Sequence, residues 1–388
     1  MRLGLILSLV SSFQIFQQSV VNELHDVDRS SLSFSLASAS FPLGQFISTL
    51  FLAVHSISAE QGLIADAWVC SGYISVNLRS WYVCVEGWLF LCVGRFLIGC
   101  GAGLGFVCST IVLYDRIPFG ARPAHFLALG LSFAFATLMI NITPLVYLSD
   151  TFILNFASVI SAASGIAYLL LRPRSGEHDL EDSVKVDFAD EPSKFPSTLV
   201  YVLMVLNVSI GVPAILAFSK TAFENFGIDP ATSSALSVAF PLIQMLLIFV
   251  LYKLPLNRKI LIVGGYIVAT MIQGSLLLTS FYQYLPEEHK TVALSVLFWL
   301  LAVVVSVPCN TALCLITEQF ASSKEQMTFA SRGRALMWVL ATVSTATFTL
   351  TMEAYGFTVC FLPYVVISTV MLAVLILIYP QQAIEVLE

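Results

Sequence analysis

The sequence predicts an all-α polytopic membrane protein with twelve transmembrane helices in two six-helix bundles, and three observations lead to this fold class. First, 58% of the 388 residues are apolar, 11% are charged and the mean hydropathy is +0.89, whereas soluble chains carry about 25% charged residues. Second, the apolar residues gather in runs of about 20, the length of helix that crosses a hydrocarbon core of about 30 Å. Third, one long polar stretch separates six runs from six.

The apolar runs follow one another along the whole chain. The first six cover 3–21, 31–54, 62–82, 88–113, 123–146 and 151–171. The second six cover 197–219, 232–252, 259–281, 291–317, 333–352 and 357–379. The first run has no small-residue cleavage site of the kind that ends a signal peptide, so we expect it to be retained as a span.

The longest polar stretch, Arg172 to Pro196, divides the chain into an N-terminal bundle (1–171), a cytoplasmic central loop (172–196) and a C-terminal bundle (197–388). With the amino terminus in the cytoplasm, 13 of the 18 Lys and Arg residues fall inside, which leaves five outside or near the outer face. This asymmetry follows the positive-inside rule and predicts an even number of spans with both termini in the cytoplasm. We expect a multi-pass protein of the plasma membrane.

The charge balance and the cysteines exclude several other classes of protein. The net charge is −6 and seven acidic residues sit in the central loop, so there is no basic face for a nucleic-acid backbone. The eight cysteines lie in or beside apolar runs without a CxxC pair, which is typical of buried apolar side chains and predicts neither a metal site nor a cofactor. Catalytic motifs such as HExxH are absent from the sequence, so we expect that the protein is not an enzyme.

A stripe of amides marks the first span. Gln14, Gln17 and Gln18 recur at helical spacings, so they share one sector of the helix. Such a stripe avoids lipid and fits either a hydrogen-bonding wall of a central cavity or plain bonding between helices.

Two spans of the C-terminal bundle contain helix breakers. Gly211 and Pro213 interrupt the seventh span, and Pro308 interrupts the tenth span just before Asn310. Proline removes a backbone donor and frees the carbonyl one turn back, which a membrane tolerates where the backbone lines a cavity or meets a neighbour. The breaks therefore predict either a binding site with a moving gate or static kinks.

Several short blocks follow a fixed order along nearly the whole chain. Residues 94–99 read GRFLIG, residues 218–228 read FSKTAFENFGI, Arg258-Lys259 follow the eighth span, and residues 317–320 read TEQF. These blocks resemble the GRFxxG, YSTxxFExxGI, GRR and AELF motifs of the sugar porter branch of the major facilitator superfamily, which includes the facilitative glucose transporters. The resemblance implies the major facilitator fold and solute transport by alternating access.

The chain departs from this family at the positions that contact sugar. The glutamine of the fifth span falls on Gly130, and the first of the paired glutamines of the seventh span falls on Asn207. Trp338 matches the family's tryptophan, and it would either stack on a ring-shaped solute or fill a helix interface. Proton-coupled sugar porters have an aspartate where Gln18 stands, and an amide cannot titrate, so the resemblance favours facilitated diffusion.

Charged residues gather near the ends of the spans. In the family, pairs of such charges latch the inner gate, and a pair that forms in one state only biases the equilibrium between conformations. Each charge could instead be a static, solvated anchor. The predicted gating network consists of Arg95, Asp115, Arg122, Arg258, Lys259, Glu318, Arg332 and Arg334.

The sequence therefore predicts a solute carrier of the uniporter type, which moves a small, neutral, sugar-like solute across a lipid bilayer. Few charged side chains share the predicted depth of the site, which favours a neutral solute. The predicted solute-binding residues are Gln14, Gln17, Gln18, Asn207, Gln244, Asn310 and Trp338, all polar or amphipathic groups inside apolar spans. The alternative is a transporter-fold protein that no longer transports and acts as a sensor or as a partner of other membrane proteins. Nothing in the sequence predicts an oligomeric state.

Overall fold

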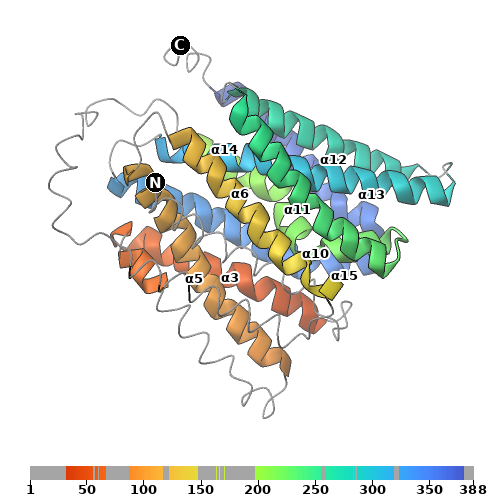
Figure 1. Ribbon diagram of the computed structural model, residues 1–388, viewed down its shortest axis with the longest axis horizontal. Helices are drawn as coiled ribbons and strands as arrows, with labels where there is room; N and C mark the ends of the chain where they lie inside the picture. The colour runs from red at the N-terminus through yellow and green to blue at the C-terminus, as the bar shows by residue number, and fades with distance from the viewer. Residues whose placement is uncertain are drawn as a thin grey trace.

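The chain folds into a bundle of long helices (Figure 1). A computed structural model describes residues 32–55, 57–59, 61–66, 87–116, 122–146, 163, 166, 170, 197–254, 259–282, 284, 286–318 and 323–379. Over these ranges the regular structure is entirely helical, without a strand. The predictions for Gln14, Gln17, Gln18 and Arg258 lie outside the described residues.

The helices follow the order of the apolar runs. Those before the central loop are α3 (Leu32–Val54), α5 (Gly87–Arg116), α6 (Arg122–Asn141) and the short η3 (Thr143–Val146). Those after it are α9 (Thr198–Ser209), α10 (Val212–Asn225), α11 (Pro230–Lys253), η5 (Ile260–Gly264), α12 (Gly265–Phe281), α13 (Glu287–Val304), α14 (Ser306–Glu318) and α15 (Ser323–Ile378).

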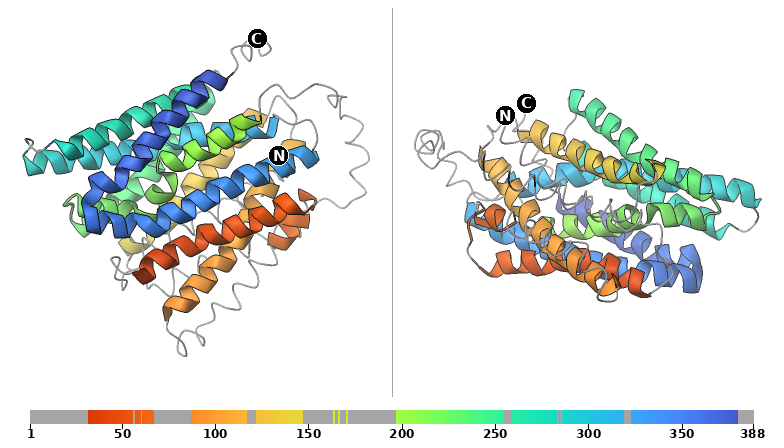
Figure 2. Two further views of the ribbon diagram at one scale, coloured as in Figure 1. Left: turned by 180° about the vertical axis from the view of Figure 1, so that it is seen from behind. Right: turned by 60° about the horizontal axis from the view of Figure 1, so that its bottom comes forward.

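Seven stretches of described helix are long and apolar enough to cross a membrane. The last of these, within α15, is 54 residues long, about 80 Å if straight and far more than a core of about 30 Å. Gly356 divides α15, because its φ of 79° and ψ of 167° are not helical. Figure 2 shows the two arms, in lighter and darker blue, with the first arm beside α3. Predicted spans 1, 3 and 6 fall wholly or mostly outside the described residues, so the count of twelve stays a prediction.

The start of α11 shows how local sequence sets a helix end. Asp229 precedes the helix, and its carboxylate accepts a hydrogen bond from the Thr232 backbone N–H at 2.9 Å. Pro230 follows at the first helical position, where its missing N–H costs nothing. The hydrogen bonds from Thr232 hold the pKa of Asp229 below its ordinary value.

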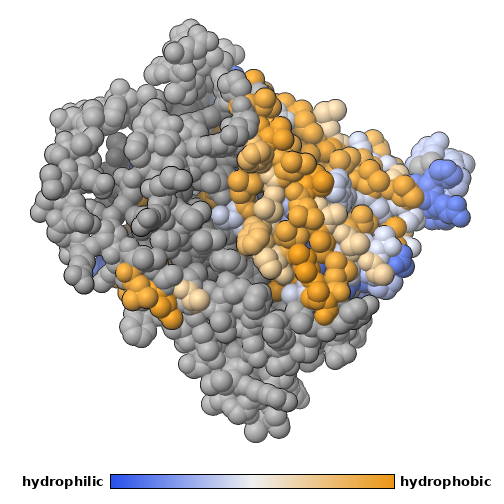
Figure 3. All heavy atoms as spheres, in the orientation of Figure 1, coloured by the Kyte–Doolittle hydropathy of each residue, from blue (hydrophilic) through white to orange (hydrophobic). Residues whose placement is uncertain are grey.

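The outward faces of α11 and α12 are apolar, as lipid contact requires. Figure 3 shows hydrophobic residues over this side of the molecule and hydrophilic residues at the tip where α12 meets α13. The exposed side chains recur at helical spacing, so each helix presents one stripe to its surroundings. On these two helices they include Leu242, Leu246, Phe249, Ile267, Met271 and Leu278.

Helices from before and after the central loop pack against each other in two places. In the first, α3 runs along the first arm of α15, and the Ser35 and Thr349 hydroxyls are 2.7 Å apart. In the second, α6 crosses α11, and Asn141 Nδ2 donates to the Ser237 carbonyl at 2.6 Å. That carbonyl lies four residues before Pro241, which has no N–H to offer it. Each contact therefore includes a polar bond between the two predicted bundles.

Candidate functional site

The helix of the seventh predicted span is interrupted, and a side chain of a neighbouring helix bonds to the backbone carbonyl that the interruption leaves free. Helix α9 ends at Ser209 and α10 begins at Val212, with Gly211 between them at φ 90°. Because Pro213 lacks an N–H, the Ser209 carbonyl has no helical donor. Gln273 Nε2 of α12 donates to this carbonyl at 2.8 Å. The Ser368 hydroxyl in turn donates to Gln273 Oε1 at 2.6 Å, so three helices meet at the break.

A second break separates α13 from α14 at Val305. Pro308 lies in the first turn of α14 and packs on Gly265, the first residue of α12, where an added Cβ would sit 2.9 Å from the proline ring. Near the same break, Gln244 Nε2 of α11 donates to the Ala302 carbonyl at 3.1 Å. The structure thus brings together breaks and amides that the sequence placed in separate spans.

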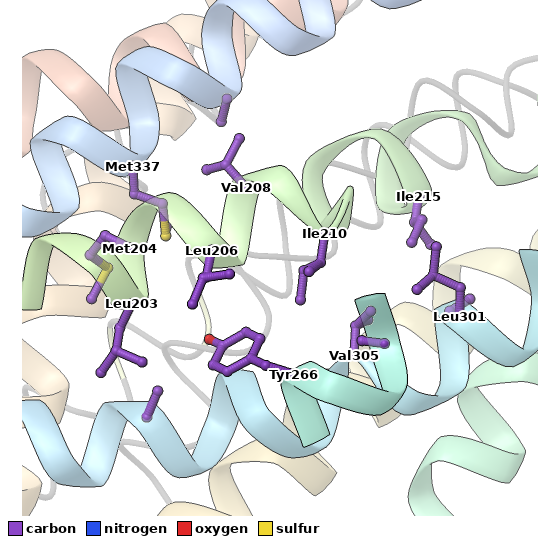
Figure 4. Close-up of a cluster of buried hydrophobic side chains, with 14 of the residues drawn as sticks. Leu203, Met204, Leu206, Val208, Ile210, Ile215, Tyr266, Leu301, Val305 and Met337 are labelled. Atoms are coloured by element: carbon purple, nitrogen blue, oxygen red, sulfur yellow. The ribbon is translucent and has the colours of Figure 1, made fainter. Parts of the chain in front are cut away.

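Asn207, a predicted binding residue, is paired with a tyrosine that the sequence did not single out. The Tyr266 hydroxyl of α12 donates to Asn207 Oδ1 at 2.5 Å, and both side chains are buried. In Figure 4 the Tyr266 ring lies beside α9 with its hydroxyl directed toward that helix. Tyr266 sits in an apolar run where a tyrosine gives no distinct sequence signal.

Arg334 lies inside the bundle and not at its surface. Its side chain is 5% exposed, and its guanidinium lies 4.1 Å from the centre of the Phe106 ring of α5. Arg334 Nη1 also lies 3.6 Å from the Met337 sulfur, and its other polar neighbours are Tyr266 and Cys309. Among the described residues, none of the contacts of Arg334 is to a carboxylate. This burial differs from the exposed gating role expected of Arg334.

The contacts that Arg334 makes with described residues do not balance the cost of its burial. A guanidinium over an aromatic face gains about 0.5 to 2 kcal/mol. Removing an ion from water costs several kcal/mol even after the protein relaxes. The difference leaves a buried positive charge that a ligand with negative charge would stabilise.

Trp338 lies one turn after Arg334 and packs on the same ring. The Trp338 and Phe106 ring centroids are 6.4 Å apart at 66°, an edge-on contact. The indole is 5% exposed, and its Nε1 has no acceptor among the described residues. Its stacking on a solute ring stays a prediction.

Asn310 fills the space beside Gly130, the position where the sugar porters have a glutamine. A Cβ added to Gly130 would lie 2.2 Å from Asn310 Nδ2. Asn310 is itself buried. An amide from α14 therefore occupies the place beside α6 that a longer side chain at position 130 would need.

Arg334, Phe106 and Asn207 lie at a similar depth. Arg334 is 11 residues from the start of α15, Phe106 is 10 residues from the end of α5, and Asn207 is 9 residues from the start of α9. At about 1.5 Å per residue they lie about 14 to 17 Å from helix ends that the sequence predicts to be cytoplasmic. That depth is near the middle of a core of about 30 Å. We call the group formed by Phe106, Asn207, Tyr266, Asn310, Arg334 and Trp338 the polar layer.

The other predicted gating residues do not join the polar layer. Arg95 is buried, its Nε donates to the Ala37 carbonyl at 2.8 Å, and its guanidinium lies over the Phe41 ring. Lys259 lies 5.8 Å from the centre of the Tyr379 ring. Arg332 is exposed. The side chains of Asp115, Arg122 and Glu318 lie outside the described part of the chain, so the latch stays a prediction.

Comparison with known proteins identifies the fold. No family model and no curated protein matches the chain. Among solved structures, the proton:xylose symporter XylE of E. coli bound to 6-bromo-6-deoxy-D-glucose matches with a TM-score of 0.77 and 13% identity, over 97% of this chain and 95% of that one. A D-xylose-proton symporter matches with a TM-score of 0.69 and 15% identity, over 97% of both chains.

A third solved structure, the human organic anion transporter MFSD10, matches with a TM-score of 0.66 and 16% identity, over 96% of this chain and 97% of that one. All three proteins are symporters or transporters, the XylE structure is that of a major facilitator superfamily protein, and the matches extend over nearly the whole length of each. The chain therefore has the fold of the major facilitator superfamily and is an integral, multi-pass membrane protein.

Proposed function

We propose that the chain is a divergent member of the sugar porter branch and transports a small organic solute by alternating access. The observation that carries the proposal is the polar layer, in which helices after the central loop contribute buried polar groups and α5, before the loop, contributes the Phe106 ring that Arg334 and Trp338 contact. A membrane bundle that served only as a scaffold would gain nothing from a buried arginine and from an indole N–H that has no acceptor in the described part of the chain.

The composition of the polar layer supports a solute rich in hydrogen-bonding groups, as a sugar is. Asn207, Tyr266 and Asn310 offer amide and hydroxyl groups, and Trp338 offers a donor beside an aromatic surface. Two of the solved structures that share the fold are proton-coupled symporters of xylose, which is a sugar. The sequence argument for a neutral solute rests on the scarcity of charge at this depth, and the buried Arg334 removes that premise.

The proposed mode is facilitated diffusion. It rests on the amide of Gln18 at the position of a titratable aspartate in proton-coupled relatives. A protonophore should then change the initial uptake rate little. Uptake driven against a gradient by pH alone would contradict this mode and would point to the buried Asp66 as the proton carrier, with Asp66→Asn as the variant to examine.

Uptake by the purified chain in proteoliposomes tests transport itself, across a panel of sugars, polyols and sugar acids. We expect saturable uptake of at least one class, and Asn207→Leu should impair it at similar protein content. The matched control is Ser275→Ala, which removes a hydroxyl from an exposed position on α12. No saturable uptake of any solute would favour the sensor or partner alternative.

We also propose the predicted topology, with bundles at 1–171 and 197–388, and with both termini and residues 172–196 in the cytoplasm. The contacts between α3 and α15 and between α6 and α11 support two bundles that face each other. Impermeant thiol labelling of single cysteines placed in the central loop should fail in intact cells and succeed after permeabilisation. Labelling of that loop in intact cells would contradict the topology.

A further inference from the structure

The buried guanidinium of Arg334 needs a negative partner that the described part of the chain does not supply. Its surroundings are the Phe106 ring, the Met337 sulfur, the Tyr266 hydroxyl and the Cys309 thiol. None of these groups is a carboxylate, and Arg334 is 5% exposed. Water can reach little of it, so an anion that enters the polar layer would stabilise the charge.

The other buried arginine of the described residues, Arg95, has a different set of contacts. Arg95 Nε donates to the Ala37 carbonyl of α3 at 2.8 Å. The backbone thus provides an acceptor for Arg95, whereas Arg334 has a ring and a thioether.

The geometry also indicates which edge of Arg334 meets a ligand. A guanidinium that covers a ring with its face keeps its N–H groups at its rim, and this rim matches the two oxygens of a carboxylate. Trp338 Nε1, one turn away, is a second donor without an acceptor among the described residues. Tyr266, which interacts electrostatically with Arg334, is bonded to Asn207, so this pair adds a hydroxyl and an amide. The site therefore offers donors for an anionic group together with partners for hydroxyl groups.

We propose that Arg334 binds the carboxylate of a small hydroxylated acid, so that the transported solute is a sugar acid and not a neutral sugar. This proposal rests on the proposed transport function and gives it a substrate class. The carboxylate pairs with the guanidinium rim, while the hydroxyl groups bond to the amides and the indole of the polar layer. The contact with the Phe106 ring holds the guanidinium in place.

A matched pair of probes tests the proposal, because D-glucuronate and D-glucose differ in one group, a carboxylate in place of CH2OH. Binding is measured as the thermal stabilisation of the purified full chain in detergent, at constant ionic strength, with sodium acetate as a simple carboxylate. We expect D-glucuronate to stabilise the protein at lower concentration than either D-glucose or acetate. The affinity of the Arg334→Gln variant for D-glucuronate should be lower than that of the natural protein by a factor on the order of 30 or more, because removing one partner of a buried charge pair has an effect of this size.

Three variants separate binding from folding. Arg334→Lys keeps the positive charge but loses the planar guanidinium that can donate to both carboxylate oxygens. Its affinity for D-glucuronate should lie between that of the natural protein and that of Arg334→Gln. Lys290→Gln removes one positive charge at the start of α13, far along the chain from the polar layer, and should bind as the natural protein does. Arg334→Gln should melt no lower than the natural protein without ligand, because it removes a buried charge that lacks a partner.

Each other outcome contradicts the proposal. Equal binding of D-glucose and D-glucuronate, or equal binding of acetate, would overturn the substrate class. Unchanged D-glucuronate binding in Arg334→Gln would overturn the role of Arg334, and a lower melting temperature of this variant without ligand would show that the arginine is structural. Uptake into proteoliposomes is measured separately from binding. If D-glucuronate binds through Arg334 but is not taken up, the proposed anion site is supported and the proposed transport function is contradicted.

Discussion

The pair of Gly130 and Asn310 shows how one residue of the polar layer depends on another. An added Cβ at position 130 would lie 2.2 Å from Asn310 Nδ2, so any larger side chain there must displace the amide. Gly130→Gln should therefore lower the yield of folded protein and the melting temperature. The double variant Gly130→Gln/Asn310→Ala should recover much of the loss, because the alanine vacates the space. Failure of the second change to improve the first would contradict this packing.

The bond between Tyr266 and Asn207 supports a second prediction at the same scale. Tyr266→Phe removes the hydroxyl and leaves Asn207 Oδ1 buried without its donor. The expected loss is about 0.6 to 1.7 kcal/mol of unfolding free energy, the range of hydrogen bonds between membrane helices. Unfolding in mixed micelles measures it, with Tyr201→Phe on α9 as the control. A similar loss in both variants would show that the hydroxyl of Tyr266 has no special role.

The sequence predicted some of these residues and missed others for a physical reason. Asn207, Asn310 and Trp338 stood out because polar or amphipathic groups are costly in apolar spans, and all three are buried in the structure. Phe106 and Tyr266 did not stand out, because an aromatic residue in an apolar run has the same pattern whether it faces lipid or a ligand. Their roles depend on neighbours from other helices.

At the scale of the helix, the break between α9 and α10 predicts that the effects of substituting Gln273 and Pro213 on stability depend on each other. Gln273→Leu leaves the Ser209 carbonyl without its donor, which should destabilise the fold. Pro213→Ala restores a backbone N–H one turn after this carbonyl, so the same Gln273→Leu change should cost less in that background. A double-mutant cycle on unfolding free energy measures the difference. Equal costs in the two backgrounds would contradict the link between the proline and the glutamine.

The limits of sequence prediction at this scale follow from the same break. Gly211 and Pro213 predict an interruption from local chemistry, because both act on their own backbone. Gln273 lies 64 residues beyond Ser209, and a single sequence holds no signal that the two meet. The predicted start of the eleventh span at 333 also lies ten residues after the start of α15 at Ser323. The first turns of α15 contain charged residues, which lower the mean hydropathy there, so a search for apolar runs does not include them.

At the scale of the molecule, the two predicted bundles are joined by polar bonds close to helix ends. Ser35 lies near the start of α3 and meets Thr349, and Asn141 is the last residue of α6 and meets Ser237 near the start of α11. The predicted topology places these bonds on the outer side of the membrane. Alternating access requires them to open when the site faces outward.

Apolar run length was enough to predict the helices that the structure describes, because lipid leaves a spanning chain few other structures. Short motifs such as residues 94–99 then indicated the fold, although the identity to the three solved transporters is only 13 to 16%. The sequence prediction of a neutral solute placed Arg334 at a helix end, and the burial of Arg334 inside the bundle is the reason that we propose an anionic solute instead.

The most direct test of alternating access around the polar layer is a crosslink between Ser35 and Thr349, whose hydroxyls are 2.7 Å apart. The double variant Ser35→Cys/Thr349→Cys, with nearby Cys360 replaced by alanine, should form a disulfide on mild oxidation. We predict that the oxidised protein still binds the solute from the inner side but loses nearly all uptake, that reduction restores uptake, and that each single cysteine variant is insensitive to oxidant. Unchanged uptake at complete crosslinking would contradict the account.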